Sequence, residues 1–339
     1  MLKTRLMGKR LRVGFVGCGE HARTNLYPCL PSLPVDLIAV CARRRDSAER
    51  AARTFGASSF YDDFQEMFSK ERLDAVFVCV RAEEHFRIAS AAVNAGLHVF
   101  LEKPATASLQ ECEALEQLAA RRERHVMVGL MKRHAPAYRK AMEIVRSPSF
   151  GPISAIDTKL CVGPLADIKH FLREVGLHHL DLVRFFAGEI QALHVEKHLS
   201  SRSEAFTLAL VCRFGNGAVG SLLMSTEQSW RGHNERVEIA GEGQSIVIDN
   251  VASLKHYRPS LQAPARDAFA GAGHEFWEPN FTVPTGYNQS LHINGFAPEV
   301  EHFVTSLLSG HKPAPGLSDF RENLKVIGAI VELLAESRT

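Results

Sequence analysis

The 339-residue sequence has no long apolar run, no paired cysteines and almost no net charge. A membrane-spanning helix needs about 18 or more consecutive apolar residues, and no segment approaches that length. The 40 Lys and Arg residues nearly balance the 38 Asp and Glu residues, which leaves a formal charge of +2 and no extended basic block. These absences argue against a membrane protein and against a nucleic-acid-binding protein.

Cysteine occurs without a spacing that would indicate a zinc site or a disulfide framework. The seven cysteines stand at positions 18, 29, 41, 79, 112, 161 and 212, and no two form a Cys-x-x-Cys pair. Scattered cysteines of this kind are typical of reduced core residues in a cytoplasmic protein. The basic N-terminus is followed only by a short apolar stretch that contains glycines, so we expect a first strand there and no signal peptide.

The first part of the chain alternates between strand and helix patterns. Apolar segments at 11–16, 35–41, 74–80 and 125–130, with a weaker one at 59–61, are typical of buried strands. Helical stretches separate them at 47–55, 63–68, 85–95 and 108–121. This alternation predicts a doubly wound, Rossmann-type parallel sheet over residues 1–131.

The second part changes to an antiparallel pattern. Strand-like segments at 206–214, 218–225, 236–241, 245–249 and 254–257 are separated by glycine-containing turns. We expect residues 132–339 to form an α/β domain with an open, mostly antiparallel sheet, whose free face binds a second copy of the chain. The segment 259–288 has little periodicity and is expected to be a long loop, in which Trp277 or Tyr287 could stack on a sugar ring or simply pack locally.

A glycine-rich turn follows the first predicted strand directly. The run Gly17-Cys18-Gly19-Glu20-His21-Ala22 fits the dinucleotide fingerprint G-x-G-x-x-G/A. Gly17 would permit the tight turn, Gly19 would let a pyrophosphate approach the backbone, and Ala22 would let the next helix pack closely. The run therefore predicts a nicotinamide-cofactor site.

The acidic residue that NAD binders carry at the end of the second strand is missing. Ala42 stands there, followed by Arg43, Arg44 and Arg45. Guanidinium groups offer forked donors and positive charge to a 2′-phosphate, so we expect NADP(H), bound by Arg43 and Arg44, with NAD(H) as the second choice. The alternative is that the three arginines begin a solvated helix.

A lysine stands where another buried strand ends. Glu102, Lys103 and Pro104 follow the apolar run 97–101. Ligands of parallel α/β sheets bind outside the carboxyl ends of the strands, so a cation there can meet the polar end of a substrate beside the cofactor.

A second group of polar residues precedes an apolar helix. Glu174, His178 and Asp181 are spaced at i, i+4 and i+7, which places them on one helix face. A carboxylate that orients an imidazole is the arrangement that general acid/base work requires. A core histidine is the alternative, and because no third ligand with motif spacing follows, we expect no metal.

Together these motifs resemble the glucose-fructose oxidoreductase, inositol dehydrogenase and MocA family. The resemblance runs from residue 13 to the last helix and is carried by the fingerprint, by the strand and histidine of 74–85, by 95–104 with its Glu-Lys-Pro, and by 176–181. It implies a Rossmann domain, a C-terminal domain with an open sheet, and dimers or tetramers. It also implies oxidation of a ring hydroxyl, or reduction of the matching ketone, on a polyhydroxylated sugar, cyclitol or derivative.

The resemblance also implies roles for individual residues. Lys103 would contact the reacting hydroxyl and the nicotinamide ribose, His178 would accept or donate the proton, and Glu102 would help to shape the nicotinamide pocket. Glu174 stands in place of the family's aspartate.

The loop after the fourth strand departs from the family pattern. Arg81 and Ala82 replace the usual Pro-Asn pair, while His85 is retained. Arg81 could contact the pyrophosphate or an anionic substrate group, or be incidental. Two other functions stay open: a cofactor-binding sensor or regulator without turnover, and a reductase of a non-sugar substrate of the dihydrodiol or biliverdin type.

Overall fold

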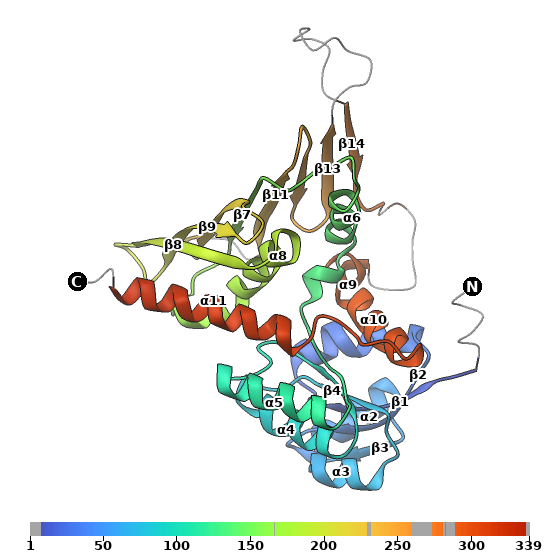
Figure 1. Ribbon diagram of the computed structural model, residues 1–339. Coiled ribbons are helices and arrows are strands. Elements are labelled where there is room, and N and C mark those ends of the chain that lie inside the picture. The colour runs from blue at the N-terminus through green and yellow to red at the C-terminus, as the bar shows by residue number, and fades with distance from the viewer. Residues whose placement is uncertain are drawn as a thin grey trace, which may run out of the picture. The chain divides into compact units, whose positions relative to one another are not determined.

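The chain forms two compact units (Figure 1). The computed structural model describes residues 8–165, 167–228, 232–258, 273–280, 282 and 289–336. The first unit comprises Met1–Met131 and Phe296–Leu324, and the second comprises Lys132–Gly295 and Lys325–Thr339. The sequence-based division assigned residues 296–324 to the C-terminal domain, whereas in the structure they group with the first unit.

The first unit contains the predicted parallel sheet. Its strand order is β3-β2-β1-β4-β5-β6, and all neighbouring strands are parallel. The strands are β1 (Leu11–Val16), β2 (Val35–Cys41), β3 (Ser59–Tyr61), β4 (Ala75–Val78), β5 (His98–Leu101) and β6 (Val126–Val128). Because β1 pairs with both β2 and β4, the order reverses beside β1, which is where a cofactor crevice opens in such folds.

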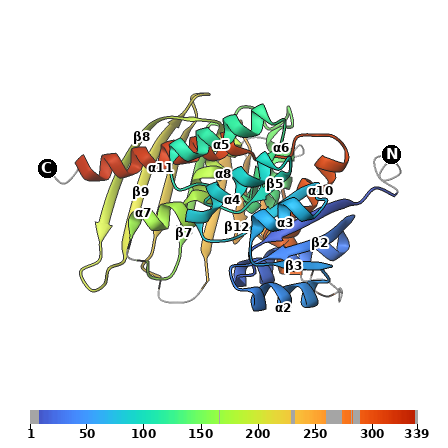
Figure 2. The ribbon, with the colours of Figure 1, turned by 90° about the horizontal axis from the view of Figure 1, so that it is seen from below.

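Helices cover this sheet. The segment after β1 is a turn of π-helix, η1 (Ala22–Leu26), continued by a 3₁₀ segment, η2 (Tyr27–Ser32). The other helices before residue 131 are α2 (Arg45–Phe55), α3 (Phe64–Lys70), α4 (Ala82–Asn94) and α5 (Leu109–Arg121). Helices α2 and α3 contact β2 and β3 (Figure 2), and α4 packs against α5.

A late segment of the chain completes the core of the first unit. Helix α10 (Phe296–Leu308) buries Phe303, whose ring meets Phe77 of β4 and Phe100 of β5 edge-on at 5.4 and 5.7 Å. The loop before α11 (Leu317–Glu336) adds a bridge between Gly316 and Met127 of β6. The apolar face of α10 is therefore needed to cover the sheet, which explains why residues 296–324 belong to the first unit.

The second unit is built on an eight-stranded sheet in the order β14-β13-β12-β11-β7-β10-β9-β8. Only the pair β7 and β10 is parallel, as expected for a mostly antiparallel sheet. The strands are β7 (Ala155–Cys161), β8 (Ile190–Leu199), β9 (Phe206–Phe214), β10 (Val219–Ser225), β11 (Asn234–Ala240), β12 (Ser245–Asp249), β13 (Ser253–Arg258) and β14 (Gly273–Trp277). The helical segments are η3 (Met131–His134, which begins in the first unit), α6 (Pro136–Val145), α7 (Ile168–Phe171), η4 (Leu172–Gly176), α8 (Leu177–Ala187) and α9 (Gln289–Ile293).

The two faces of this sheet differ. Alternate residues of β9 and β10, such as Leu210 and Leu222, are buried on the face that receives α8. On the other face Val211, Val219 and Leu223 are 57, 52 and 40% exposed. The expected open face is therefore present and partly apolar.

Three strands were not predicted. Strands β7 and β8 lie outside the expected segments, and β14 lies inside the expected loop 259–288. The ring of Trp277 lies 5.2 Å from the Lys140 ammonium, which favours local packing of this side chain. Residues 259–272, 281 and 283–288 of that loop, including Tyr287, lie outside the described residues.

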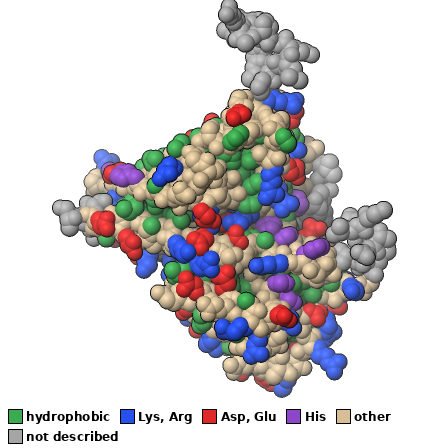
Figure 3. All heavy atoms as spheres, in the orientation of Figure 1, with side chains coloured by type: hydrophobic (Ala, Val, Ile, Leu, Met, Phe, Trp, Pro, Cys, Tyr) green, Lys and Arg blue, Asp and Glu red, His purple; other side chains and the backbone are tan. Residues whose placement is uncertain are grey.

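No helix within the described part of the chain is both long and apolar enough to cross a membrane. Acidic and basic side chains are intermixed over the face drawn in Figure 3.

Candidate functional site

A cavity of about 710 Å³ opens at the carboxyl ends of β1, β2 and β4. The complete fingerprint run 17–22 lines it, as do Arg43 after β2 and Arg81 after β4. Asp62 and Asp63, which follow β3, also reach it. The predicted turn and two of the predicted cationic residues therefore meet in one hollow of the first unit.

The glycines of the turn have the properties that a dinucleotide requires. Gly17 has φ +115°, and a Cβ added there would lie 1.9 Å from the Cys79 carbonyl oxygen. At Gly19 an added Cβ would have nothing within 4 Å, so this backbone faces open space in which a pyrophosphate fits. The Tyr27 hydroxyl, which sequence reasoning missed, donates a hydrogen bond to the Gly17 carbonyl at 3.1 Å and holds the turn.

The three arginines after β2 have different surroundings. Arg43 lines the cavity and has no ion pair with another described residue. Arg44 donates to the Ser47 hydroxyl at 3.1 and 3.3 Å and is absent from the lining. Arg45 lies 3.8 Å from Asp62 and has its guanidinium 5.0 Å from the ring centre of Phe60.

His85 acts on the turn that carries Lys103. It is 1% exposed, and its Nε2 accepts a hydrogen bond from the Val80 amide at 3.4 Å. Its Nδ1 then donates to the Pro104 carbonyl at 2.8 Å, which ties the loop after β4 to the residues that follow Lys103. His85 is not among the residues that line the cavity.

Glu102 is held between the fingerprint and the end of β5. Its Oε1 lies 3.3 Å from Nε2 of His21, and its Oε2 accepts from the Lys103 amide at 3.0 Å. Asn25 donates to the other His21 nitrogen at 2.9 Å, which leaves Nε2–H to donate to Glu102. Burial raises the pKa of the Cys79 thiol in the cavity wall. Glu102 raises this pKa further, and Lys103 lowers it.

His178 lies in the second unit, at the start of α8, and is 6% exposed. Glu174 is half-buried in η4, a π-helical turn. The expectation of a regular α-helix over 174–181 was therefore wrong. The i→i+5 turn changes the angle between Glu174 and His178 about the helix axis. Such π turns are frequent at functional sites.

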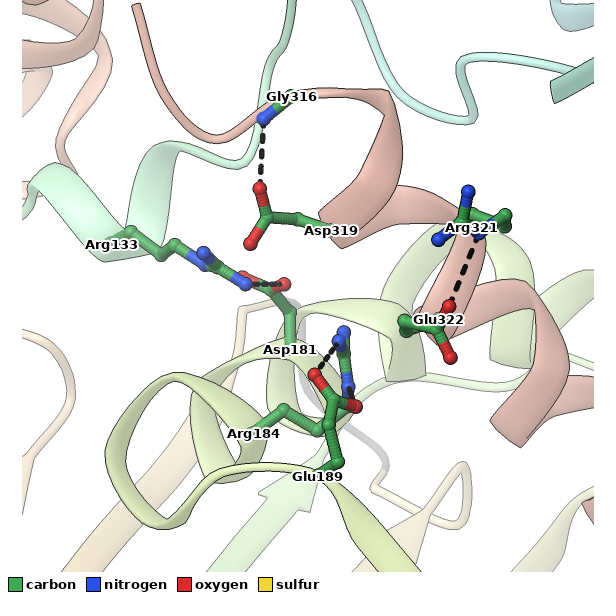
Figure 4. Close-up of polar contacts among 8 residues, drawn as sticks. All are labelled: Arg133, Asp181, Arg184, Glu189, Gly316, Asp319, Arg321 and Glu322. Atoms are coloured by element: carbon green, nitrogen blue, oxygen red, sulfur yellow. Dashed lines mark hydrogen bonds and ion pairs between the residues drawn. The ribbon is translucent and has the colours of Figure 1, made fainter. Parts of the chain in front are cut away.

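Asp181 has a strong partner that the sequence did not suggest. Arg133 of η3 donates to both carboxylate oxygens, at 2.6 and 2.7 Å, and the pair is drawn in Figure 4. Both side chains are largely buried. Asp181 was one of two carboxylates expected to orient His178, and its bidentate bond to Arg133 gives it a role in joining η3 to α8.

A second buried charge cluster was also missed. Glu235 of β11 bonds the Lys132 ammonium and lies 2.8 Å from Nε2 of His179. Burial works to raise the Glu235 pKa, but Lys132 and His179 outweigh it and hold this pKa well below its usual range. Lys132 stands beside Arg133 and His134 without a recognised motif, so no sequence signal pointed to this cluster.

Comparisons with known proteins agree with this geometry. The model described as "Oxidoreductase family, NAD-binding Rossmann fold" matches residues 11–130, and the GFO/IDH/MocA C-terminal domain model matches residues 138–247. Inositol 2-dehydrogenase of Rhizobium meliloti is 22% identical over 97% of this chain and 98% of its own length.

Solved structures show the same fold. A dehydrogenase from Chromobacterium violaceum has a TM-score of 0.85 at 21% identity, covering 97% of this chain and 98% of that one. A levoglucosan dehydrogenase in complex with NADH and levoglucosan has a TM-score of 0.82 at 20% identity, with the same coverage.

Proposed function

We propose a reaction from the premise that this chain belongs to the glucose-fructose oxidoreductase, inositol dehydrogenase and MocA family. The proposed reaction interconverts a ring hydroxyl and the matching ketone of a sugar, cyclitol or derivative, using NADP(H). Membership makes the chain a nicotinamide-dependent dehydrogenase or reductase. The observation that carries the proposal is the cavity at the carboxyl ends of β1, β2 and β4, lined by the whole glycine turn.

The preference for NADP(H) rests on the residues at the end of β2. Ala42 and Arg43 both line the cavity where an NAD binder would present a carboxylate. The two acidic residues nearby are engaged elsewhere, since Asp62 faces Arg45 and Asp63 accepts a hydrogen bond from the Gln65 amide at 2.9 Å. Arg43 is thus the cation that we assign to the 2′-phosphate, and Arg44 a secondary contact.

When bound, the nicotinamide supplies or accepts the hydride. We assign stabilisation of the reacting oxygen to Lys103 and transfer of its proton to His178. The Lys103 ammonium binds the reacting oxygen and stabilises developing alkoxide charge, while the His178 imidazole moves the hydroxyl proton. Glu174 is the carboxylate that we assign to orienting that imidazole or a neighbouring substrate hydroxyl.

The choice of a polyhydroxylated substrate rests on the relatives and on these polar groups. Inositol 2-dehydrogenase is named for a cyclitol and levoglucosan dehydrogenase for an anhydrosugar. We further propose a cytoplasmic homodimer or homotetramer, associated through the open face of the second unit's sheet.

The experiment is a turnover screen of sugars and cyclitols with NADP⁺, and of ketosugars with NADPH. Lys103→Met and His178→Ala should each lower turnover by roughly 10²-fold or more, because each removes a group that acts in proton transfer or charge stabilisation. Arg139→Met, at an exposed position of α6, serves as the control. Turnover near the parent value in both variants would remove them from catalysis, and cofactor binding without any turnover would favour a sensor.

A further inference from the structure

A buried carboxyl group lies on the inner face of α10. Glu299 is one helical turn after Phe296 and one turn before Phe303, and it is 0% exposed. The Phe296 ring meets the His21 ring edge-on at 5.6 Å, whereas Phe303 packs on Phe100. Neither carboxyl oxygen of Glu299 finds a hydrogen-bond partner among the described residues. An ionised carboxylate in such surroundings is strongly disfavoured, so Glu299 is held as the neutral acid.

The flanking contacts place Glu299 beside Glu102. Glu102 is 4% exposed, stands two residues after Phe100, and lies 3.3 Å from His21. Phe303 contacts Phe100 and Phe296 contacts His21, so Glu102 lies near the same part of α10 as Glu299. Two donors face Glu102, the His21 Nε2–H and the Lys103 amide.

The charge of Glu102 acts on the Glu299 carboxyl group. Burial, followed by the charge of Glu102, raises the pKa of Glu299 well above its usual range. Cys29 of η2 also faces Glu299. Burial, and then Glu299, raise the pKa of this thiol to about 12, so that it stays neutral. His21 of η1, and Cys79 and Lys103 at the sheet end, face the Glu102 side of the pair.

We propose that Glu299 makes the affinity for the cofactor depend on the charge of the nicotinamide ring, so that the oxidised form binds with release of the Glu299 proton. This inference rests on the proposed function, in which Glu102 borders the nicotinamide. The oxidised ring carries a positive charge that the reduced ring lacks, and a second nearby carboxylate stabilises only the positive ring. The Glu299 acid becomes a carboxylate and its proton goes to solvent. By linkage, affinity for the oxidised cofactor then rises with pH, while affinity for the reduced cofactor does not.

The test is calorimetric titration of the full chain with NADP⁺ and with NADPH, from about pH 6 to about pH 9. The 2′-phosphate is common to both cofactors, so its titration drops out of the ratio of the two dissociation constants. This ratio should change by up to about tenfold per pH unit for one linked proton. Buffers of different ionisation enthalpy report the released proton directly. Glu299→Gln replaces the acid by a neutral group of the same shape and should abolish the dependence, whereas Glu301→Gln, exposed on the same helix, should keep it.

The outcomes separate the inference from the function on which it rests. A pH-independent ratio in the parent protein, or a dependence that survives Glu299→Gln, overturns the inference while the oxidoreductase assignment stands. Binding of neither cofactor overturns the assignment. If Glu299→Gln fails to fold, the proton count of the parent protein decides, because absence of release on binding NADP⁺ alone contradicts the inference.

Discussion

At the residue scale, buried charges separate what the sequence reveals from what it hides. Lys103 and His178 could be proposed as site residues because each follows a recognisable pattern, a lysine behind a strand and a histidine on an apolar helix. Glu235 and Glu299 were missed, because a lone glutamate in a strand or helix reads as a solvated residue. Only the fold shows that these residues are 4 and 0% exposed.

The Lys132–Glu235 pair provides a stability prediction. Glu235→Gln leaves the Lys132 ammonium buried without its counter-charge, so unfolding free energy should fall by about 3–5 kcal/mol. Replacing both residues, as Lys132→Met with Glu235→Leu, should cost much less. Urea unfolding monitored by circular dichroism measures both effects, and equal losses in the single and double variants would contradict the account.

The same pair sets a pH dependence. Because the folded-state pKa of Glu235 is lowered, its stabilising contribution is present above the unfolded-state pKa of about 4.3 and is lost as pH falls toward the folded value. Acidification from neutral pH should therefore destabilise the parent protein more than Glu235→Gln. Urea unfolding curves of both proteins, at neutral pH and at acidic pH, test this prediction. Equal losses of unfolding free energy in the two proteins would count against it.

At the scale of elements, strands and turns with strong local signals were predicted well. Strands β1, β2 and β4 were anticipated from their apolar runs, and the fingerprint turn from its glycine spacing. Strand β8 was missed because it is an edge strand in which only Val195 is buried, so its pattern carries little periodicity. The π turn η4 also has no local signal.

The fingerprint turn yields an element-scale prediction with a matched pair. Gly17→Ala should destabilise the fold by about 2 kcal/mol or more, because its Cβ collides with the Cys79 carbonyl at a positive φ. Gly19→Ala should leave stability within about 0.5 kcal/mol, yet weaken cofactor binding, because its methyl group fills the pyrophosphate approach. Thermal unfolding and cofactor titration separate the two, and unchanged binding in Gly19→Ala would contradict this use of the turn.

At the scale of the whole molecule, the class of each sheet, parallel or mostly antiparallel, was predictable from the alternation of patterns, but the division of the chain was not. Helix α10 looks like any other amphipathic helix, so the sequence gives no reason to join it to β4 and β5. Its assignment depends on a core contact, Phe303 against Phe77 and Phe100, between residues about 200 apart in the chain.

The open face of the second sheet leads to a prediction about assembly. Val211→Lys with Leu223→Lys places two cations on that face and should dissociate the proposed oligomer, because a desolvated like-charge cluster disfavours the isologous interface. Gln110→Lys with Gln117→Lys, exposed on α5, adds the same charge elsewhere and should leave assembly unchanged. Light scattering after size-exclusion chromatography gives the masses. A monomeric parent protein, or a variant of unchanged mass, would refute this interface.

The most direct measurement is titration of the purified protein with NADPH and with NADH, followed by nicotinamide fluorescence. The account predicts binding of NADPH at least tenfold tighter, about 1.4 kcal/mol, and loss of most of that preference in Arg43→Ala but not in Arg45→Ala. Equal or reversed preference would contradict the role of Arg43. Binding of neither cofactor would contradict the central claim that this chain is a nicotinamide-dependent oxidoreductase.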